Sequence, residues 1–164
     1  MGAELNTDKA AQYAYRLLAV RPLSEKEFRT KLKGKGFDSA VVEAAAARFR
    51  ELGYLNDESV ARQWARSLAV NRLWGNRRIE MSLREKGVSR ELIADAISLA
   101  REEITEREAV VQLLGKKVKG ERIHPEDRRE KRRLLQSLMG KGFPPGSIFE
   151  ILSLSGEEDV HDGE

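Results

Sequence analysis

A chain of 164 residues, 40% hydrophobic and 35% charged, is long enough for one ordinary domain or for a few small packed units. Five acidic residues and no base lie in 155–164, so the net charge of +3 becomes +8 without that segment, which suits a polyanionic partner. The absence of cysteine excludes disulfide scaffolds, cysteine zinc sites and thiol catalysis. No apolar run approaches the roughly 18 residues of a membrane span, and the first residues lack a signal-peptide pattern, so we expect a cytoplasmic protein.

The first third of the chain predicts three amphipathic helices. Apolar spacing marks a helix near 9–20, and Ser24 with Glu27 forms a capping box that starts a second helix. Asp38 is suited to cap a third helix. The apolar stripe of that third helix consists of Val42, Ala45, Ala46 and Phe49.

The remaining two thirds predict further helices of the same kind. In the middle third of the chain the first helix is expected near 58–71, and in the last third near 107–118. The start signals are Asn56 or Asp57, Ser89, the capping box of Thr105 with Glu108, and Pro125. Alternating, strand-like runs are absent, so the pattern predicts about nine helices and no sheet.

A Lys-Gly-apolar turn recurs three times along the chain. Six residues around it repeat with an offset of 51 and then of 55. They are Phe28, Leu32, Lys35, Gly36, Phe37 and Val42; Ile79, Leu83, Lys86, Gly87, Val88 and Ile93; and Leu134, Leu138, Lys141, Gly142, Phe143 and Ile148. Glycine after lysine fits a helix C-cap in the left-handed conformation, so Gly36, Gly87 and Gly142 are predicted to be structural turns.

The repeat divides the chain into three three-helix units and a tail. The predicted units are 8–53, 54–104 and 105–155, the third with a basic insertion, followed by an acidic, disordered tail at 156–164. A unit of about 50 residues buries too little surface to be comfortably stable alone, whereas three in series, each packed on its neighbours, form a short solenoid. We therefore predict an all-α fold of three tandem three-helix repeats in an elongated, curved helical array.

No group of residues has the pattern of a catalytic or metal site. His124 stands in a charged segment and His161 in the acidic tail, and neither has a histidine partner four residues away. The segment 115–120 imitates the start of a phosphate-binding loop, but Glu121 stands where that loop needs lysine. We expect neither an enzyme nor a bound cofactor or metal ion.

The residues with functional promise are basic. Trp74 and Gly75 are flanked by a first set, Arg72, Arg77 and Arg78. Arginine suits bidentate phosphate or carboxylate contacts, and Trp74 is expected to be exposed beside it; the alternative is a solvated helix end. A second set is either an electrostatic footprint on nucleic acid or a solvated linker: Lys116, Lys117, Lys119, Arg128, Arg129, Arg132 and Arg133. Core packing rather than base stacking is favoured for the aromatic residues Tyr13, Tyr15, Phe49 and Trp64.

Three stretches of the chain form an ordered series of motifs. They are AYRLLAVRPLSEKEFRTKLKGKGF at 14–37, LGYLNDESVARQWARSLAVNR at 52–72 and GNRRIEMSLREKGVSRELIADAI at 75–97. The most specific part is Gly53-Tyr54-x-x-Asp57, then Ala61, then Gly75-x-x-Arg78-Ile79 and Leu83-x-x-Lys86-Gly87. This series strongly resembles the RecX family, whose members are small regulators of the RecA recombinase, over roughly residues 10–155. Asn56 and Val60 stand where the family usually has Asp and Phe, and the third unit is the least family-like.

The resemblance implies a function that the residues alone do not indicate. RecX-type proteins lie in the helical groove of the RecA–DNA filament, inhibit its ATP hydrolysis and strand exchange, and limit filament growth. The resemblance also implies that no cofactor is bound, because the nucleotide belongs to the partner. We rank Arg72, Arg77, Arg78 and Lys86 as the contacts with that partner, and we expect a monomer with no membrane partner.

Two other functions stay open at this stage. Three-helix units with a turn resemble helix-turn-helix modules, so the alternative is direct, largely non-sequence-specific binding to single- or double-stranded DNA. Sequence-specific reading is disfavoured, because the helix within 39–49 offers few Arg, Asn or Gln side chains to base edges. A purely structural helical scaffold is excluded only by the resemblance.

Overall fold

The computed structural model describes residues 2–118 and 128–157, and within them the chain forms helices and turns but no strand. The first unit consists of α1 (Gly2–Val20), α2 (Glu25–Gly34) and α3 (Ser39–Glu51); the second of α4 (Asp57–Arg66), α5 (Asn76–Glu85) and α6 (Arg90–Glu103); the third of α7 (Glu106–Val118), α8 (Arg128–Gly140) and α9 (Pro145–Glu157). These nine helices in the described ranges confirm the predicted all-α class.

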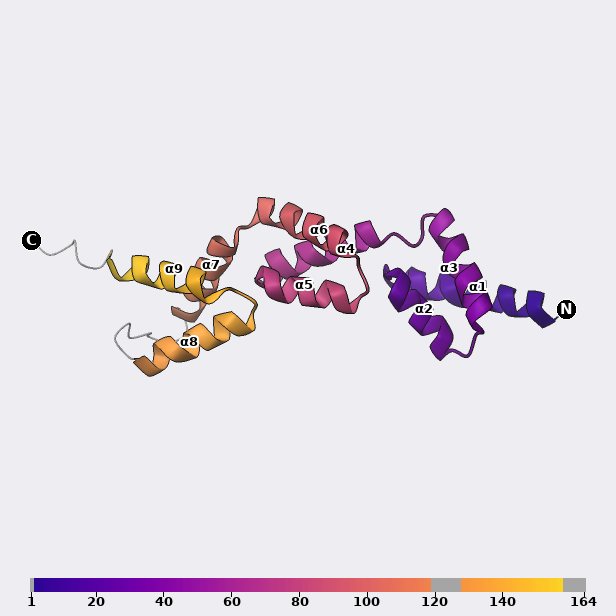
Figure 1. The fold of residues 1–164 in the computed structure, drawn as a ribbon, viewed down its shortest axis with the longest axis horizontal. Helices are drawn as coiled ribbons and strands as arrows, with labels where there is room; N and C mark the ends of the chain where they lie inside the picture. The colour runs from indigo at the N-terminus through magenta and orange to yellow at the C-terminus, as the bar shows by residue number, and fades with distance from the viewer. Residues whose placement is uncertain (1, 119–127, 158–164) are drawn as a thin grey trace, which may run out of the picture.

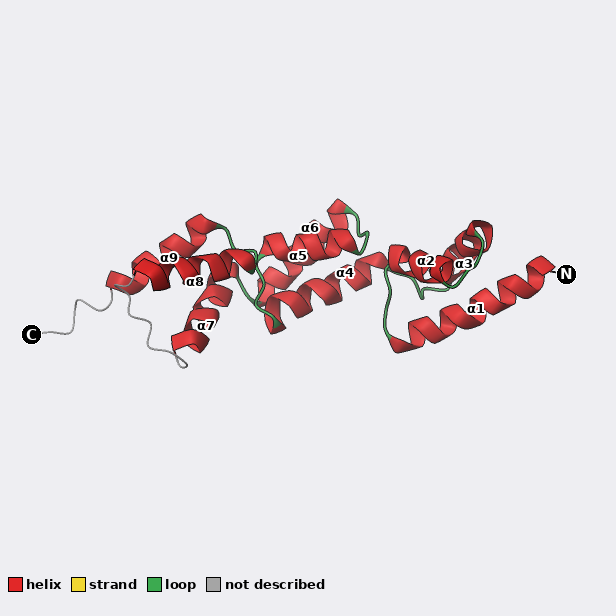
Figure 2. Ribbon diagram, turned by 90° about the horizontal axis from the view of Figure 1, so that it is seen from below, coloured by secondary structure: helices red, strands yellow, loops and turns green. Residues whose placement is uncertain are grey.

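The three units follow one another along the long axis of the molecule, with the N-terminus and α9 at opposite ends (Figure 1). The middle helices α2, α5 and α8 run along one edge of this array, the lower one in Figure 1. The first helices α1, α4 and α7 lie together on one side in the view of Figure 2. The predicted elongated array of three-helix repeats is therefore confirmed.

Local capping signals start most of the helices where the sequence predicts. Ser24 Oγ accepts the Glu27 amide at 3.1 Å while the Glu27 carboxylate accepts the Ser24 amide at 2.9 Å, which completes a capping box. Thr105 and Glu108 form the same reciprocal pair. Single caps are made by Asn56 and by Ser89. Asp38 occupies its expected N-cap position, but its side chain makes no capping hydrogen bond, which corrects that prediction.

Two helices differ from the predicted boundaries. Helix α1 starts at Gly2 instead of near residue 9, because helix-forming residues continue ahead of the apolar stripe. The second unit does not contain one helix over 58–71, because a π-helical turn, η1 (Ser67–Asn71), follows α4. Leu73 then takes a left-handed φ of 53° and is buried, so this wide turn delivers its side chain to the core.

The three Lys-Gly turns have the predicted geometry. Gly36, Gly87 and Gly142 have φ values of 98°, 76° and 94°. In the first turn the Gly36 amide donates to the Lys33 carbonyl and the Phe37 amide to the Leu32 carbonyl, which is a Schellman motif. The same pair of hydrogen bonds ends α5 and α8. A glycine in this conformation therefore ends the middle helix of every unit.

The core is divided into two clusters. One belongs to the first unit and contains the predicted stripe of α3, all four residues of which are buried. The other joins the second and third units and contains the repeat positions Ile79, Leu83, Leu134 and Leu138. Of the aromatic residues expected in the core, Phe49 is fully buried and Tyr13 and Trp64 are partly buried, whereas Tyr15 packs edge-on against Phe49 but stays 42% exposed.

Candidate partner-binding surfaces

A cluster of arginines lies on Trp74 at the start of α5. The Arg78 guanidinium carbon is 3.9 Å from the centroid of the Trp74 ring, and that of Arg72 is 5.6 Å away. Trp74 itself is only partly exposed because it packs against the core shared by the second and third units, which corrects the expectation of an exposed ring. Arg72 and Arg77 are exposed. These two cations face solvent at the centre of the array.

Arg78 belongs to the junction between the second and third units. Its Nη1 donates to the Gly140 carbonyl at 3.1 Å, and the Gly75 amide donates to the Lys141 carbonyl at 2.7 Å. The backbones touch here, because a Cβ added to Gly75 would overlap the carbonyl group of Gly142. Arg78 therefore stabilises the contact between the second and third units, in addition to its place in the arginine cluster.

Lys86 belongs to the equivalent junction between the first and second units. Its Nζ lies 2.7 Å from Glu27 Oε1 and 4.4 Å from the Trp64 ring centroid, and only 14% of its side chain is exposed. The carbonyl of Lys86 accepts the Ser24 hydroxyl at 2.5 Å. Burial opposes ionisation of Glu27, but hydrogen bonds from Lys86, the Ser24 amide and Arg21 outweigh it and lower the pKa of Glu27 to about 2.

Both junctions also use an acid that sequence reasoning did not single out for this task. Asp57, the first residue of α4, accepts the Glu25 amide at the start of α2 at 2.8 Å. Glu106, the first residue of α7, accepts the Asn76 amide at the start of α5 at the same distance. Each acid thereby satisfies a free amide of the preceding unit's middle helix and interacts favourably with its dipole. Burial raises the pKa of Asp57.

The basic residues of α8 form an exposed face. Arg128, Arg129, Arg132 and Arg133 are all exposed and follow one another at i, i+1, i+4 and i+5. Their α8 neighbours Leu134 and Leu138 are buried in the core. Lys116 is exposed on α7, Lys117 lies within α7, and Lys119 falls outside the described residues, as do His124, Pro125 and His161. We call the four arginines the basic face of α8.

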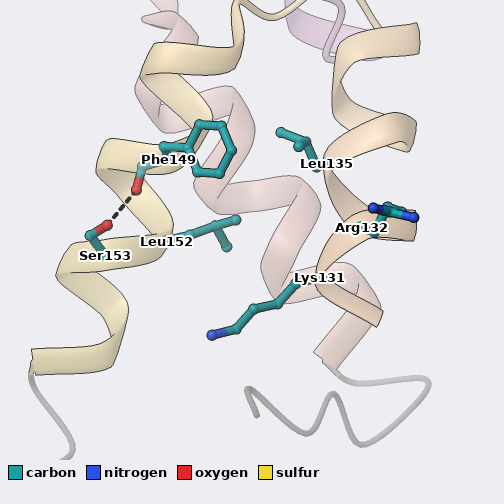
Figure 3. Close-up of a pocket in the computed structure, with 6 residues that line it drawn as sticks. All are labelled: Lys131, Arg132, Leu135, Phe149, Leu152 and Ser153. Atoms are coloured by element: carbon teal, nitrogen blue, oxygen red, sulfur yellow. Dashed lines mark hydrogen bonds between the residues drawn. The ribbon is translucent and has the colours of Figure 1, made fainter. Parts of the chain in front are cut away.

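A groove of about 380 Å³ runs between α8 and α9 beside this face (Figure 3). Its apolar lining is Leu135, Phe149 and Leu152, and Phe149 is 56% exposed. Lys131 and Arg132 supply charge along the α8 side. A groove of this kind is chemically suited to an apolar side chain that is accompanied by an acid.

The described residues contain no cluster of metal-ligating side chains and no membrane-spanning helix. Among them no three His, Asp or Glu side chains gather closely enough to hold a metal. None of their helices is both long enough and apolar enough to cross a bilayer.

Comparison with known proteins matches every unit. The first, second and third three-helix domains of RecX match residues 10–49, 56–97 and 105–152, respectively. The chain belongs to the RecX family. Two proteins named regulatory protein RecX illustrate the relationship: that of Mycolicibacterium smegmatis is 32% identical over 90% of this chain and 79% of its own length, and that of Syntrophotalea carbinolica is 31% identical over 85% and 92%.

Solved RecX structures share the fold. The crystal structure of RecX from Lactobacillus salivarius superimposes with a TM-score of 0.77 over 90% of this chain and 95% of its own, at 23% sequence identity. A second crystal structure, of a regulatory protein RecX, gives a TM-score of 0.75. The succession of three-helix units along one axis is thus an arrangement that RecX proteins share.

Proposed function

We propose that this chain regulates the RecA recombinase by binding the RecA–DNA filament and inhibiting its ATP hydrolysis, its extension and its strand exchange. The observation that carries the proposal is that all three RecX domains match, in order, between residues 10 and 152. The relatives' name, regulatory protein RecX, supports a regulatory role over an enzymatic one. The protein would act in the cytoplasm, as a monomer, where recombinase and DNA are found.

The shape and the charge of the molecule support this proposal. A long, curved array of helices contacts several protomers of a helical filament at once more readily than a sphere of equal volume does. Arg72 and Arg77 are exposed at the centre of the array, so they are the best candidates among the four predicted partner contacts. Arg78 and Lys86 are committed to the junctions, and their effect on partner binding would be largely through the placement of the units.

DNA-dependent ATP hydrolysis by the cognate recombinase tests the proposal directly. We expect the rate to fall as this protein is added, and electron microscopy to show shorter filaments. The double variant Arg72→Ala with Arg77→Ala should inhibit less while keeping its thermal unfolding midpoint. An unchanged hydrolysis rate and unchanged filament length at saturating protein would contradict the proposed function.

Direct DNA binding is the second candidate, and the basic face of α8 is the observation that favours it. Four exposed arginines on one side of a helix can neutralise phosphates of a nucleic acid backbone. Binding of this kind would be insensitive to DNA sequence and strongly weakened by salt. The two candidates are compatible, because the filament contains DNA.

A further inference from the structure

The first and second units contain the same hollow at the same register. In the second unit it has a volume of about 270 Å³ and lies against α4, where Gln63, Trp64 and Lys86 line it. In the first unit it has a volume of about 240 Å³ and lies against α1, where Gln12, Tyr13 and Lys35 line it. The offset of 51 residues relates Gln12 to Gln63, Tyr13 to Trp64 and Lys35 to Lys86. The two hollows are therefore copies of one feature of the repeat.

The preceding unit forms one wall of the second unit's hollow and covers Lys86, so we call this hollow the closed copy. Arg21 and Pro22, just before α2, form its outer wall. Immediately after them, Ser24 donates to the Lys86 carbonyl and Glu27 pairs with the Lys86 ammonium. The segment that docks on Lys86 beside this hollow is thus the first turn of a helix with a hydroxyl at the N-cap and a carboxylate three residues later.

The hollow of the first unit shares those three positions, but no other unit of the described chain forms a wall of it. Lys35 lies over the Tyr13 ring at 5.6 Å, as Lys86 lies over Trp64, but Lys35 is exposed. A Cβ added to Gly87 would stand 2.6 Å from Lys26 of the preceding unit, whereas one added to Gly36 would meet nothing within 4 Å. The turn that receives a helix in the second unit is therefore open in the first.

The open hollow is also more basic than its closed copy. Lys9 and Arg16 stand where the second unit has Val60 and Ser67. Like Lys35, both are exposed, and the ion pairs among the described residues engage none of the three. Three such cations at an aromatic-lined hollow favour an anionic occupant.

We propose that this hollow, the N-terminal socket, binds the first turn of an acidic helix of a partner protein, a helix with a hydroxyl N-cap and a carboxylate in its first turn. The hydroxyl and the carboxylate are inferred from the contacts of Ser24 and Glu27 with Lys86 at the closed copy. The acidic character of the helix is inferred from the additional bases of the socket, Lys9 and Arg16.

A second copy of this chain is a poor occupant. Its equivalent helix, α8, has no hydroxyl residue at its start, and Arg128 and Arg129 outnumber the one acid of its first turn, Glu130. The acidic segment of the same chain follows α9, which lies at the end of the array opposite to α1 (Figure 1). Taking the recombinase as the partner rests on the proposed function.

A charge reversal with a matched control tests the socket on the intact protein. Lys35→Glu places an acid in the socket, and Lys33→Glu makes the same change of charge two residues earlier, at an exposed position that does not line it. On preformed recombinase filaments we expect Lys35→Glu to raise the dissociation constant about tenfold or more and Lys33→Glu to change it less than twofold. Equal effects of the two substitutions would overturn the socket, since they would reflect overall charge alone.

Cross-linking identifies the occupant. The chain has no cysteine, so Lys35→Cys provides a single thiol for a benzophenone label. We expect the label to attach to the start of an acidic helix of the recombinase. Attachment to DNA or to a second copy of this chain would overturn the proposal in favour of a nucleic acid site or of self-association.

A peptide experiment tests the socket without the recombinase, so its result is independent of the proposed function. The peptide has the sequence of residues 21–34 with Lys26, Lys31 and Lys33 changed to Glu, because the native segment carries five bases and two acids and the basic socket would repel it. In the chain, the first turn of this segment lies against Lys86 beside the closed hollow. Added to the full chain, the peptide should shift the NMR resonances of Tyr13 and Phe37, and a Glu27→Lys version of the peptide should bind at least several-fold more weakly. Peptide binding without any filament binding would contradict the proposed function alone, whereas equal behaviour of the two peptides would contradict the socket.

Discussion

Gly142 has to be glycine for two separate physical reasons. Its φ of 94° is in the left-handed region, and a Cβ there would stand 2.5 Å from the Arg78 backbone nitrogen. Gly36 shares the first reason only, because a Cβ there meets no neighbour. The two positions thus separate the conformational cost of a side chain from the cost of displacing the next unit.

We expect Gly36→Ala to lower the free energy of unfolding by about 1–2 kcal/mol and Gly142→Ala by about 2–5 kcal/mol. The difference arises because α5 must move away from the turn to admit the methyl group. Urea unfolding followed by circular dichroism measures both values. Equal losses at the two positions would show that the junction does not depend on close backbone contact.

The ionisation of Glu27 makes the stability of the junction between the first two units depend on pH. The pKa of Glu27 in the folded chain, about 2, lies below the ordinary value of 4.5, so its ionised form stabilises the fold fully above about pH 4.5. This contribution is lost as the pH falls from 4.5 towards 2. After allowance for partial solvent screening it is about 1–2 kcal/mol.

Glu27→Gln should therefore flatten the decline in stability between pH 5 and pH 2. Urea unfolding at several pH values measures the slope for the variant and the wild type. Glu58→Gln, an exposed position on α4, removes one negative charge elsewhere and serves as the control. A variant at Glu27 that keeps the wild-type slope would mean that its pairing with Lys86 does not form in solution.

At the scale of helices, Ser24 does more than an ordinary cap. Its hydroxyl accepts the Glu27 amide and donates to the Lys86 carbonyl, and the residue is fully buried. Ser89 caps α6 with one longer hydrogen bond of 3.4 Å and is exposed. We expect Ser24→Ala to cost about 2–4 kcal/mol, because it also leaves a carbonyl unsatisfied, and Ser89→Ala about 0.5–1 kcal/mol. Thermal unfolding of both variants checks the order, and the reverse order would contradict the role of Ser24 in the junction.

The helices and their ends were largely predictable because their signals are local. A capping box such as Ser24 with Glu27 spans three residues, and the Schellman turn at Gly36 needs only the residues from Leu32 to Phe37. The π-helical turn after α4 was not predictable, because the same apolar spacing fits a continuous α-helix. Its position is set by tertiary packing of Leu68 and Leu73 in the shared core.

The candidate site was predictable only in part, because its decisive contacts are long-range. Lys86 was selected for its charge and its motif, yet its carboxylate partner is 59 residues away. Arg78 likewise meets a carbonyl that is 62 residues away. The missed signal was in the repeat itself. The offset of 51 relates Ser24 to Gly75, and the offset of 55 relates Lys86 to Lys141, so both junctions use the same positions of successive units.

For the whole molecule, the two basic surfaces should respond differently to salt. Four Arg→Ala substitutions remove the basic face of α8. For binding to duplex DNA, the variant should show a smaller slope of log K against log salt, by about one for each phosphate that it no longer neutralises. The double variant Arg72→Ala with Arg77→Ala should weaken filament binding with little change in that slope. Fluorescence anisotropy on bare DNA and on filaments at several salt concentrations measures both. Identical slopes for the two variants would reject this division of roles.

The division of the core into two clusters makes the array unevenly stiff. Bending the second unit against the third would open a continuous apolar interior, whereas the first unit meets the second mainly through hydrogen bonds and ion pairs around Ser24, Asp57 and Lys86. A change of angle at this joint would expose polar groups that can bond water, rather than a continuous apolar interior. Flexure is therefore concentrated at one joint, roughly a third of the way along the chain. The second and third units would move as one rigid body, and the first unit would rotate against them. Such a molecule can adapt to a helical target whose pitch varies.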